Sequence, residues 1–136
     1  MALAQAFGQV NWIAILLGGV FNTIVGTLWY GPLFGKLWLE LIGKKKEEIT
    51  VSAAVYIGPF VTALVSALVL ALVIEGFGIS SWWQGIVMGA LLWIGIGAAA
   101  TLTTSVFEGK KKGLWLLYAL YQLLVFMVLG LVFVVW

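Results

Sequence analysis

The amino-acid sequence predicts an all-α, polytopic membrane protein with four transmembrane helices and a short interfacial helix after the first. Of the 136 residues, 64% are hydrophobic and only 9% are charged, whereas about 25% of the residues of soluble domains are charged. Four apolar runs are long enough to cross a bilayer core, which takes about 20 residues in a helix. The charged residues all fall in the connections between these runs.

The four expected spans form a single membrane domain that covers residues 1–136. They extend over about residues 10–30, 51–74, 82–106 and 113–136. Backbone polar groups in lipid must be satisfied within the segment, so these runs are expected to be helices. A β-barrel would instead show alternating segments of about ten residues.

The distribution of lysine predicts the orientation. All seven lysines lie in residues 31–50 and 107–112, whereas the connection between the second and third spans holds only Glu75. By the positive-inside rule, both lysine-bearing loops face the cytoplasm and both termini lie outside. The protein is therefore expected in the cytoplasmic (inner) membrane. The N-terminal residues lack the basic start of a signal peptide, so we expect the first span to stay in the mature protein.

Two lysine clusters could also recruit a partner. Lys44–Lys46 and Lys110–Lys112 lie at the expected membrane surface, where each lysine can attract anionic lipid by about 1 kcal/mol. The alternative is that these clusters only set the topology.

The exit of the first span is the most distinctive stretch of the chain. Aromatic residues, a Gly-Pro pair and the first lysine occur together there: Trp29, Tyr30, Gly31, Pro32, Phe34, Gly35, Lys36 and Trp38. The residue before a proline avoids helical geometry, so we expect a break at Gly31-Pro32. Apolar residues then recur at helical spacing, which predicts an interfacial helix over about residues 32–43. The alternative is that the first helix simply continues into the headgroup region.

Small residues mark the expected packing faces. The glycines concerned are Gly18, Gly26, Gly85, Gly89 and Gly97. Such lines let helix backbones approach closely in lipid. The fourth span has no such line, and we expect it to make more lipid contact.

Lys36 and Glu108 are candidates for an ion pair at the cytoplasmic boundary, because each stands beside a phenylalanine and a glycine. In the alternative, Lys36 extends to lipid phosphate and Glu108 is solvated. Polar residues within the spans, above all Asn22 and Gln122, are costly in hydrocarbon unless paired. They either form hydrogen bonds between helices or line a polar cavity.

The chain resembles the small bacterial membrane proteins catalogued as domain of unknown function 1761. The resemblance rests on Asn11-Trp12, on the run from Leu28 to Trp38, and on the turn Phe107, Glu108, Gly109 and Lys110. It implies a four-helix membrane fold and no assigned activity. The last helix of the family often carries Tyr followed by His. Here Tyr121 is followed by Gln122, so a role that needs a titrating imidazole is in doubt.

Catalysis is not expected. The chain has no cysteine and no histidine, so the usual nucleophile, metal ligand and neutral-pH base are missing. We expect no metal, no cofactor and no nucleic-acid partner. The favoured function is that of a structural or interaction protein, a homo-oligomer or accessory subunit that packs through its glycine faces. The alternative is a small transporter or channel for an uncharged or hydrophobic solute. Small multidrug transporters have a similar size, but they use a carboxylate in the first helix that this chain lacks.

Overall fold

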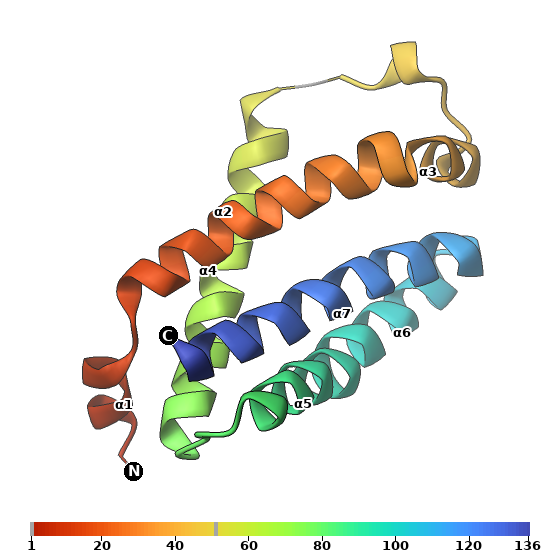
Figure 1. The fold of residues 1–136 in the computed structure, drawn as a ribbon. Coiled ribbons are helices and arrows are strands. Elements are labelled where there is room, and N and C mark those ends of the chain that lie inside the picture. The colour runs from red at the N-terminus through yellow and green to blue at the C-terminus, as the bar shows by residue number, and fades with distance from the viewer. Residues whose placement is uncertain (1, 51) are drawn as a thin grey trace.

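The computed structural model describes residues 2–50 and 52–136, and this part of the chain consists of helices joined by short connections, without strands (Figure 1). Four helices are long and apolar enough to cross a membrane: Trp12–Leu33, Ala53–Gly76, Trp82–Phe107 and Lys112–Val135. These helices confirm the predicted fold class. Met1 and the expected first residue of the second span, Val51, lie outside the described residues.

Several spans are composed of more than one helical segment. In chain order the elements are α1 (Leu3–Gln9), α2 (Trp12–Leu28), the π-helical turn η1 (Trp29–Leu33), α3 (Gly35–Ile42), the 3₁₀ turn η2 (Lys46–Glu48), α4 (Ala53–Gly76), α5 (Trp82–Leu92), the π-helical turn η3 (Trp93–Ala98), α6 (Ala99–Phe107) and α7 (Lys112–Val135). The second and fourth spans are single helices, whereas the first and third each contain a π-helical turn.

Local chemistry sets the helix ends. The Asn11 side chain accepts a hydrogen bond from the Ala14 N–H at 3.0 Å, which caps α2. Gly43, Gly78 and Gly109 have positive φ angles of 71°, 64° and 67° and turn the chain after α3, α4 and α6. Glycine adopts this left-handed conformation without the penalty that a Cβ atom brings.

Helix α7 is the central helix of the bundle. It lies beside α5 and α6 along its length (Figure 1) and also contacts α2, α3 and α4. Its buried residues are Leu114, Leu117, Ala119, Tyr121, Val125, Leu129, Gly130 and Phe133. The expectation that the fourth span makes more lipid contact is therefore wrong. Large apolar side chains suit lipid and a bundle centre equally well, so its composition could not separate the two environments.

The core lies where α4 crosses α2 and α7. Ala67, Leu70, Ala71 and Ile74 of α4 are at most 2% exposed. They pack in one cluster with α2 and α7. Alanines at this crossing permit close contact between the helices.

The break after the first span lies farther along the chain than expected. The chain stays helical through Gly31 and Pro32 to Leu33, because the Phe34 N–H donates to the Trp29 carbonyl at 2.9 Å and closes a π-type turn. The wider turn carries the helix past a proline that has no N–H to donate. The direction changes at Phe34, and α3 begins at Gly35 rather than at residue 32.

Helix α3 is docked on the start of α7. The Trp38 Nε1–H donates to Tyr118 Oη at 3.1 Å, and Leu41 lies against Gly113. Leu37 remains 45% exposed. The predicted separate helix after the first span is therefore present, with one face held by α7.

Candidate functional site

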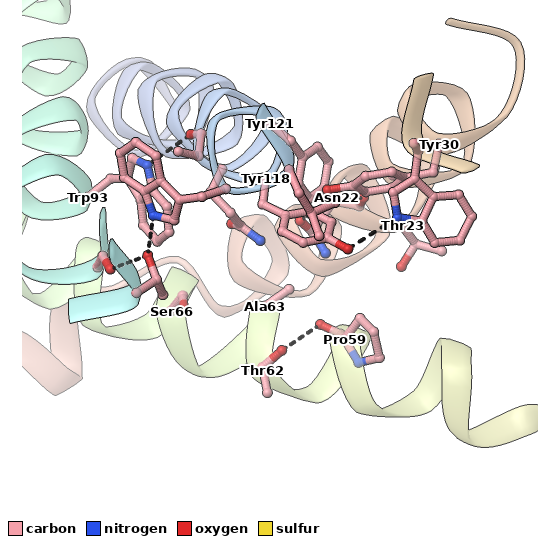
Figure 2. A pocket seen from close by; sticks show the side chains of 18 of the residues that line it. Asn22, Thr23, Tyr30, Pro59, Thr62, Ala63, Ser66, Trp93, Tyr118 and Tyr121 are labelled. Carbon is pink, nitrogen blue, oxygen red and sulfur yellow. Dashed lines mark hydrogen bonds between the residues drawn. The ribbon is translucent and has the colours of Figure 1, made fainter. Parts of the chain in front are cut away.

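A half-open cavity of about 1730 Å³ lies between α4 and the other three spans. Figure 2 shows one wall with Tyr30, Tyr118, Tyr121 and Trp93, and Thr62 of α4 on the opposite side. Pockets for drug-sized molecules occupy about 300–1,000 Å³. The cavity therefore has room for a ligand with a long apolar body.

The divergence of α4 creates this cavity. Its second half packs through Ala67 and Ala71, whereas its first half is exposed up to Pro59. Tyr56 and Val65 line the cavity and are still 51% and 58% exposed. The cavity is therefore open to the surroundings along α4.

A buried hydrogen bond joins α2 to α7 beside the cavity. The Tyr121 hydroxyl donates to Asn22. Two acceptors of this residue lie within reach, the side-chain Oδ1 at 2.6 Å and the backbone carbonyl oxygen at 2.7 Å. Gly26 leaves room for this hydroxyl, since a Cβ atom there would lie 2.9 Å from it. Gly26 thus accommodates a polar contact, whereas the sequence predicted a close approach of backbones.

Three indole groups fasten neighbouring segments to α7 around the cavity. The Trp38 Nε1–H donates to Tyr118, as described above. The Trp93 Nε1–H donates to the Ala119 carbonyl at 2.9 Å, and the Trp115 Nε1–H donates to Thr101 Oγ1 at 3.1 Å. These bonds satisfy the indole donors within the protein and hold the rings in the cavity wall.

Other polar groups line the cavity in addition to these indoles. Within the described chain, the structure shows no hydrogen bond to the side chains of Ser66 and Gln122, or to the Asn22 amide nitrogen. By contrast, Thr23 and Thr104 donate to carbonyls of their own helices. An unpaired amide is costly in hydrocarbon. The cavity therefore suits water, or a ligand that offers hydrogen bonds.

Both π-helical turns contribute to the wall. Tyr30, Gly31 and Pro32 of η1 line the cavity, as do Trp93 and Gly97 of η3. A Cβ atom at Gly97 would overlap the Trp93 ring, so Gly97 accommodates this ring. Such turns within helices are frequent at functional sites.

The end of the cavity toward α3 carries charge. Lys36, Lys46, Glu108 and Lys110 line it. Glu108 forms an ion pair with Lys110 at 2.8 Å, and this hydrogen bond raises the pKa of Lys110 above its usual range.

The expected ion pair between Lys36 and Glu108 is not found within the described chain, where the recorded ion pair is Glu108–Lys110. The left-handed turn at Gly109 lets Lys110 reach the carboxylate from the same loop. A local partner takes the place of the distant one that the sequence predicted.

Most of the residues singled out from the sequence meet at this cavity. Those that line it are Asn22, Tyr30, Gly31, Pro32, Gly35, Lys36, Trp38, Glu108, Lys110, Tyr121 and Gln122. Trp29 and Phe34 lie behind the wall, with ring centroids 4.6 Å apart, and the buried Trp29 Nε1 has no partner in the described chain. Phe107 is 87% exposed and takes no part in the wall.

The remaining glycines pack inside the chain. Cβ atoms at Gly85 and Gly89 of α5 would overlap the backbone of α7 at Gly130 and Phe126. Gly18 of α2 faces Leu129, where a Cβ atom would come within 3.1 Å. These three positions agree with the predicted role in helix packing, and the contacts are internal to one molecule.

Sequence reasoning missed some of the cavity residues. The clearest are Trp93, Trp115 and Tyr56. One signal was available, because Trp93 stands in the middle of a span rather than at the membrane interface where tryptophan usually lies. A buried indole N–H also requires an acceptor nearby.

Comparison with known proteins identifies a family and nothing more specific. No curated protein and no solved structure matches the chain. The family model described as "Protein of unknown function (DUF1761)" matches residues 13–134. This range contains the exit stretch of the first span and the Phe107–Lys110 turn, and begins just after Asn11-Trp12. The chain belongs to this family of proteins of unknown function.

Proposed function

We propose that the protein binds a small amphiphilic molecule in the cavity and carries it between the lysine-bearing surface and the bilayer. The observation that supports this most strongly is a set of polar groups without a hydrogen-bond partner among the described residues, along a cavity of about 1730 Å³ within the spans. These groups are the side chains of Ser66 and Gln122 and the Asn22 amide nitrogen. Polar groups inside membrane segments commonly mark ligand or ion pathways.

The shape and the chemistry of the cavity favour an amphiphile over a small polar solute. The exposed flank of α4 opens the cavity sideways through Tyr56 and Val65, where lipid surrounds a membrane-spanning helix. Apolar side chains such as Val69 and Ile96 share the wall with the polar groups. A molecule with an apolar body and a hydrogen-bonding head satisfies both.

The other functional class is a structural protein that assembles through glycine faces. Gly18, Gly85 and Gly89 already contact helices of the same chain, so they leave little surface for a second copy. Homo-oligomerisation stays a prediction without support from the packing. Native mass spectrometry after gentle extraction tests it directly, because it reports subunit number, partner subunits and bound lipid.

The orientation is part of the proposal. The lysine-bearing loops would face the cytoplasm and both termini would lie outside, in the cytoplasmic membrane. The mouth of the cavity would then open on the cytoplasmic side. Lys44–Lys46 and Lys110–Lys112 would attract anionic lipid to that surface.

Quenching of tryptophan fluorescence tests the binding. Trp38, Trp93 and Trp115 line the cavity, so a brominated alkanol bound there will quench them. The protein is reconstituted in phosphocholine vesicles and titrated with the alkanol. We expect a saturable component above the linear background of alkanol dissolved in the bilayer.

A blocking variant and its control identify the site. Ser66→Phe places a bulky ring in the middle of the cavity, whereas Val61→Phe places the same ring on a part of α4 that is 50% exposed and does not line it. Loss of the saturable component in Ser66→Phe alone supports the proposal. Equal, purely linear quenching in wild type and in both variants refutes it.

A further inference from the structure

We infer that the ligand of the cavity is an anionic amphiphile, whose phosphate, sulfate or carboxylate head lies at the lysine end and whose apolar body lies along α4. This inference rests on the proposed function, and it specifies the ligand class that the cavity selects. It contrasts with the uncharged or hydrophobic solute that belonged to the alternative function, a small transporter or channel, in the sequence analysis.

The mouth of the cavity, which is its end toward α3, carries positive charge. Three lysines line this end of the cavity: Lys36, Lys46 and Lys110. Among the described residues, Glu108 is the acidic residue that lines it with them. Glu108 is engaged by Lys110 at 2.8 Å. Within the described chain, the structure shows no ion pair for Lys36 or Lys46, although Glu47 and Glu48 follow Lys46 directly. The mouth therefore keeps an excess of positive charge.

Aromatic residues that carry hydroxyl groups line the cavity together with these lysines. The ring centroid of Tyr30 lies 5.5 Å from that of Trp38 and 5.7 Å from that of Tyr118. Hydroxyl and ammonium donors together suit an oxyanion, since charge-assisted hydrogen bonds are the stronger kind. A cation would meet like charge at the entrance.

A purely apolar occupant does not match the polar groups of the cavity. Such a molecule would leave the lysine ammonium groups and the Gln122 amide without partners. Farther along the wall the cavity offers apolar surface for the body of the ligand, at residues such as Val69, Leu92 and Ile96. Head and body therefore have separate places in one cavity.

The chain supplies a matched control for the lysines. Lys44 and Lys45 stand directly before Lys46 in the same connection, but they do not line the cavity. The variant K44Q/K45Q removes the same number of charges from the same loop as K36Q/K46Q. Both variants therefore change the surface potential and the topology signal alike, and only one changes the cavity.

The experiment titrates reconstituted wild type, K36Q/K46Q and K44Q/K45Q with a brominated alkyl phosphate and with the brominated alkanol of the same chain length. We expect K36Q/K46Q to weaken alkyl phosphate binding about ten- to thirtyfold, from about 1 kcal/mol per lysine. K44Q/K45Q should weaken it by less than about threefold, because charges outside the cavity are largely screened. Alkanol binding should be the same in all three proteins, which also shows that each variant is folded.

A second arm identifies the source of the anion, with brominated phosphatidylglycerol and brominated phosphatidylcholine in place of the single-chain probes. Selective, lysine-dependent quenching by phosphatidylglycerol assigns the head to a membrane lipid. Lysine-dependent quenching by the alkyl phosphate alone assigns it to a free amphiphile. Equal affinity for phosphate and alkanol, or equal losses in both lysine variants, overturns the inference and leaves the proposed function intact. Absence of saturable quenching by any probe refutes the proposed function itself.

Discussion

The two ends of the helical bundle are packed in opposite ways. Where α5 meets α7, glycines bring the two backbones into direct contact at Gly85, Gly89 and Gly130. Toward α3, the start of α4 is exposed as far as Pro59, and aromatic and polar side chains line the cavity between α4 and the other spans. The same set of helices thus forms a closed end and an open end.

The contrast shows what controls helix separation in this chain. Association in lipid depends on van der Waals packing, so small residues are needed for close approach. The closed end has them on facing helices, whereas the open end carries tyrosine and tryptophan. There the helices are held by directed hydrogen bonds, such as the one from Tyr121 to Asn22. The following three substitutions probe this difference, from the largest expected effect to the smallest.

Gly89→Ala should have the largest effect, because the new methyl group would overlap the Phe126 carbonyl and force α5 away from α7. We expect the free energy of unfolding to fall by about 1–3 kcal/mol, as in overpacked cores. Unfolding in mixed micelles with a denaturing detergent measures it. Gly95→Ala is the control, since nothing lies within 4 Å of its added methyl group. Equal losses in the two variants would show that the closed end is not tightly packed.

Tyr121→Phe should have an intermediate effect. It removes the buried hydroxyl that bonds to Asn22 and joins α2 to α7, and interhelical hydrogen bonds contribute about 0.6 kcal/mol on average and up to about 1.7 kcal/mol. Tyr118→Phe is the comparison, because this side chain is 38% exposed and should cost less. The same unfolding assay applies. A larger loss for Tyr118→Phe would show that the contact of α7 with Trp38 of α3 contributes more to stability than its contact with Asn22 of α2.

Gln122→Leu should have the smallest effect on stability, within about 0.5 kcal/mol. Its amide has no hydrogen-bond partner in the described chain, so nothing inside the protein is lost. Asn22→Leu, by contrast, should cost more than Gln122→Leu but no more than Tyr121→Phe, because it removes the Oδ1 acceptor while the Asn22 carbonyl stays 2.7 Å from the Tyr121 hydroxyl. The two losses should not add in the double variant, since both act on the same contact. A loss for Gln122→Leu as large as that for Asn22→Leu would mean that Gln122 is structurally engaged.

The amino-acid pattern predicts much of this fold and less of its site. Length and hydropathy locate the four spans within a few residues. They do not identify α7 as the central helix, since Val125 and Leu129 suit lipid and a helix interface equally. The exit stretch marks the right region, but the break falls at Phe34 because a π-helical turn accommodates Pro32.

The cavity depends on three-dimensional relations that the sequence does not encode locally. Asn22 and Gln122 are recognisable as unusual residues in apolar spans. That Asn22 bonds to Tyr121, whereas Gln122 faces the cavity, depends on how α2 and α7 are rotated against each other. The partner of Glu108 depends on the turn at Gly109, so residue type alone suggested Lys36 as a candidate where the structure has Lys110.

Single-cysteine labelling tests the central claim, that the open end admits water among the spans. The chain has no cysteine, so each introduced thiol is the only target. Ser66→Cys lies in the cavity, Val61→Cys is exposed outside it, and Ala67→Cys is 0% exposed. A charged maleimide is added to sealed vesicles on each side in turn, with labelling in denaturing detergent as the reference for complete reaction. The account predicts that Ser66→Cys reacts from the lysine-bearing side, whereas Val61→Cys and Ala67→Cys do not react. Ser66→Cys that is as unreactive as Ala67→Cys from both sides would contradict it.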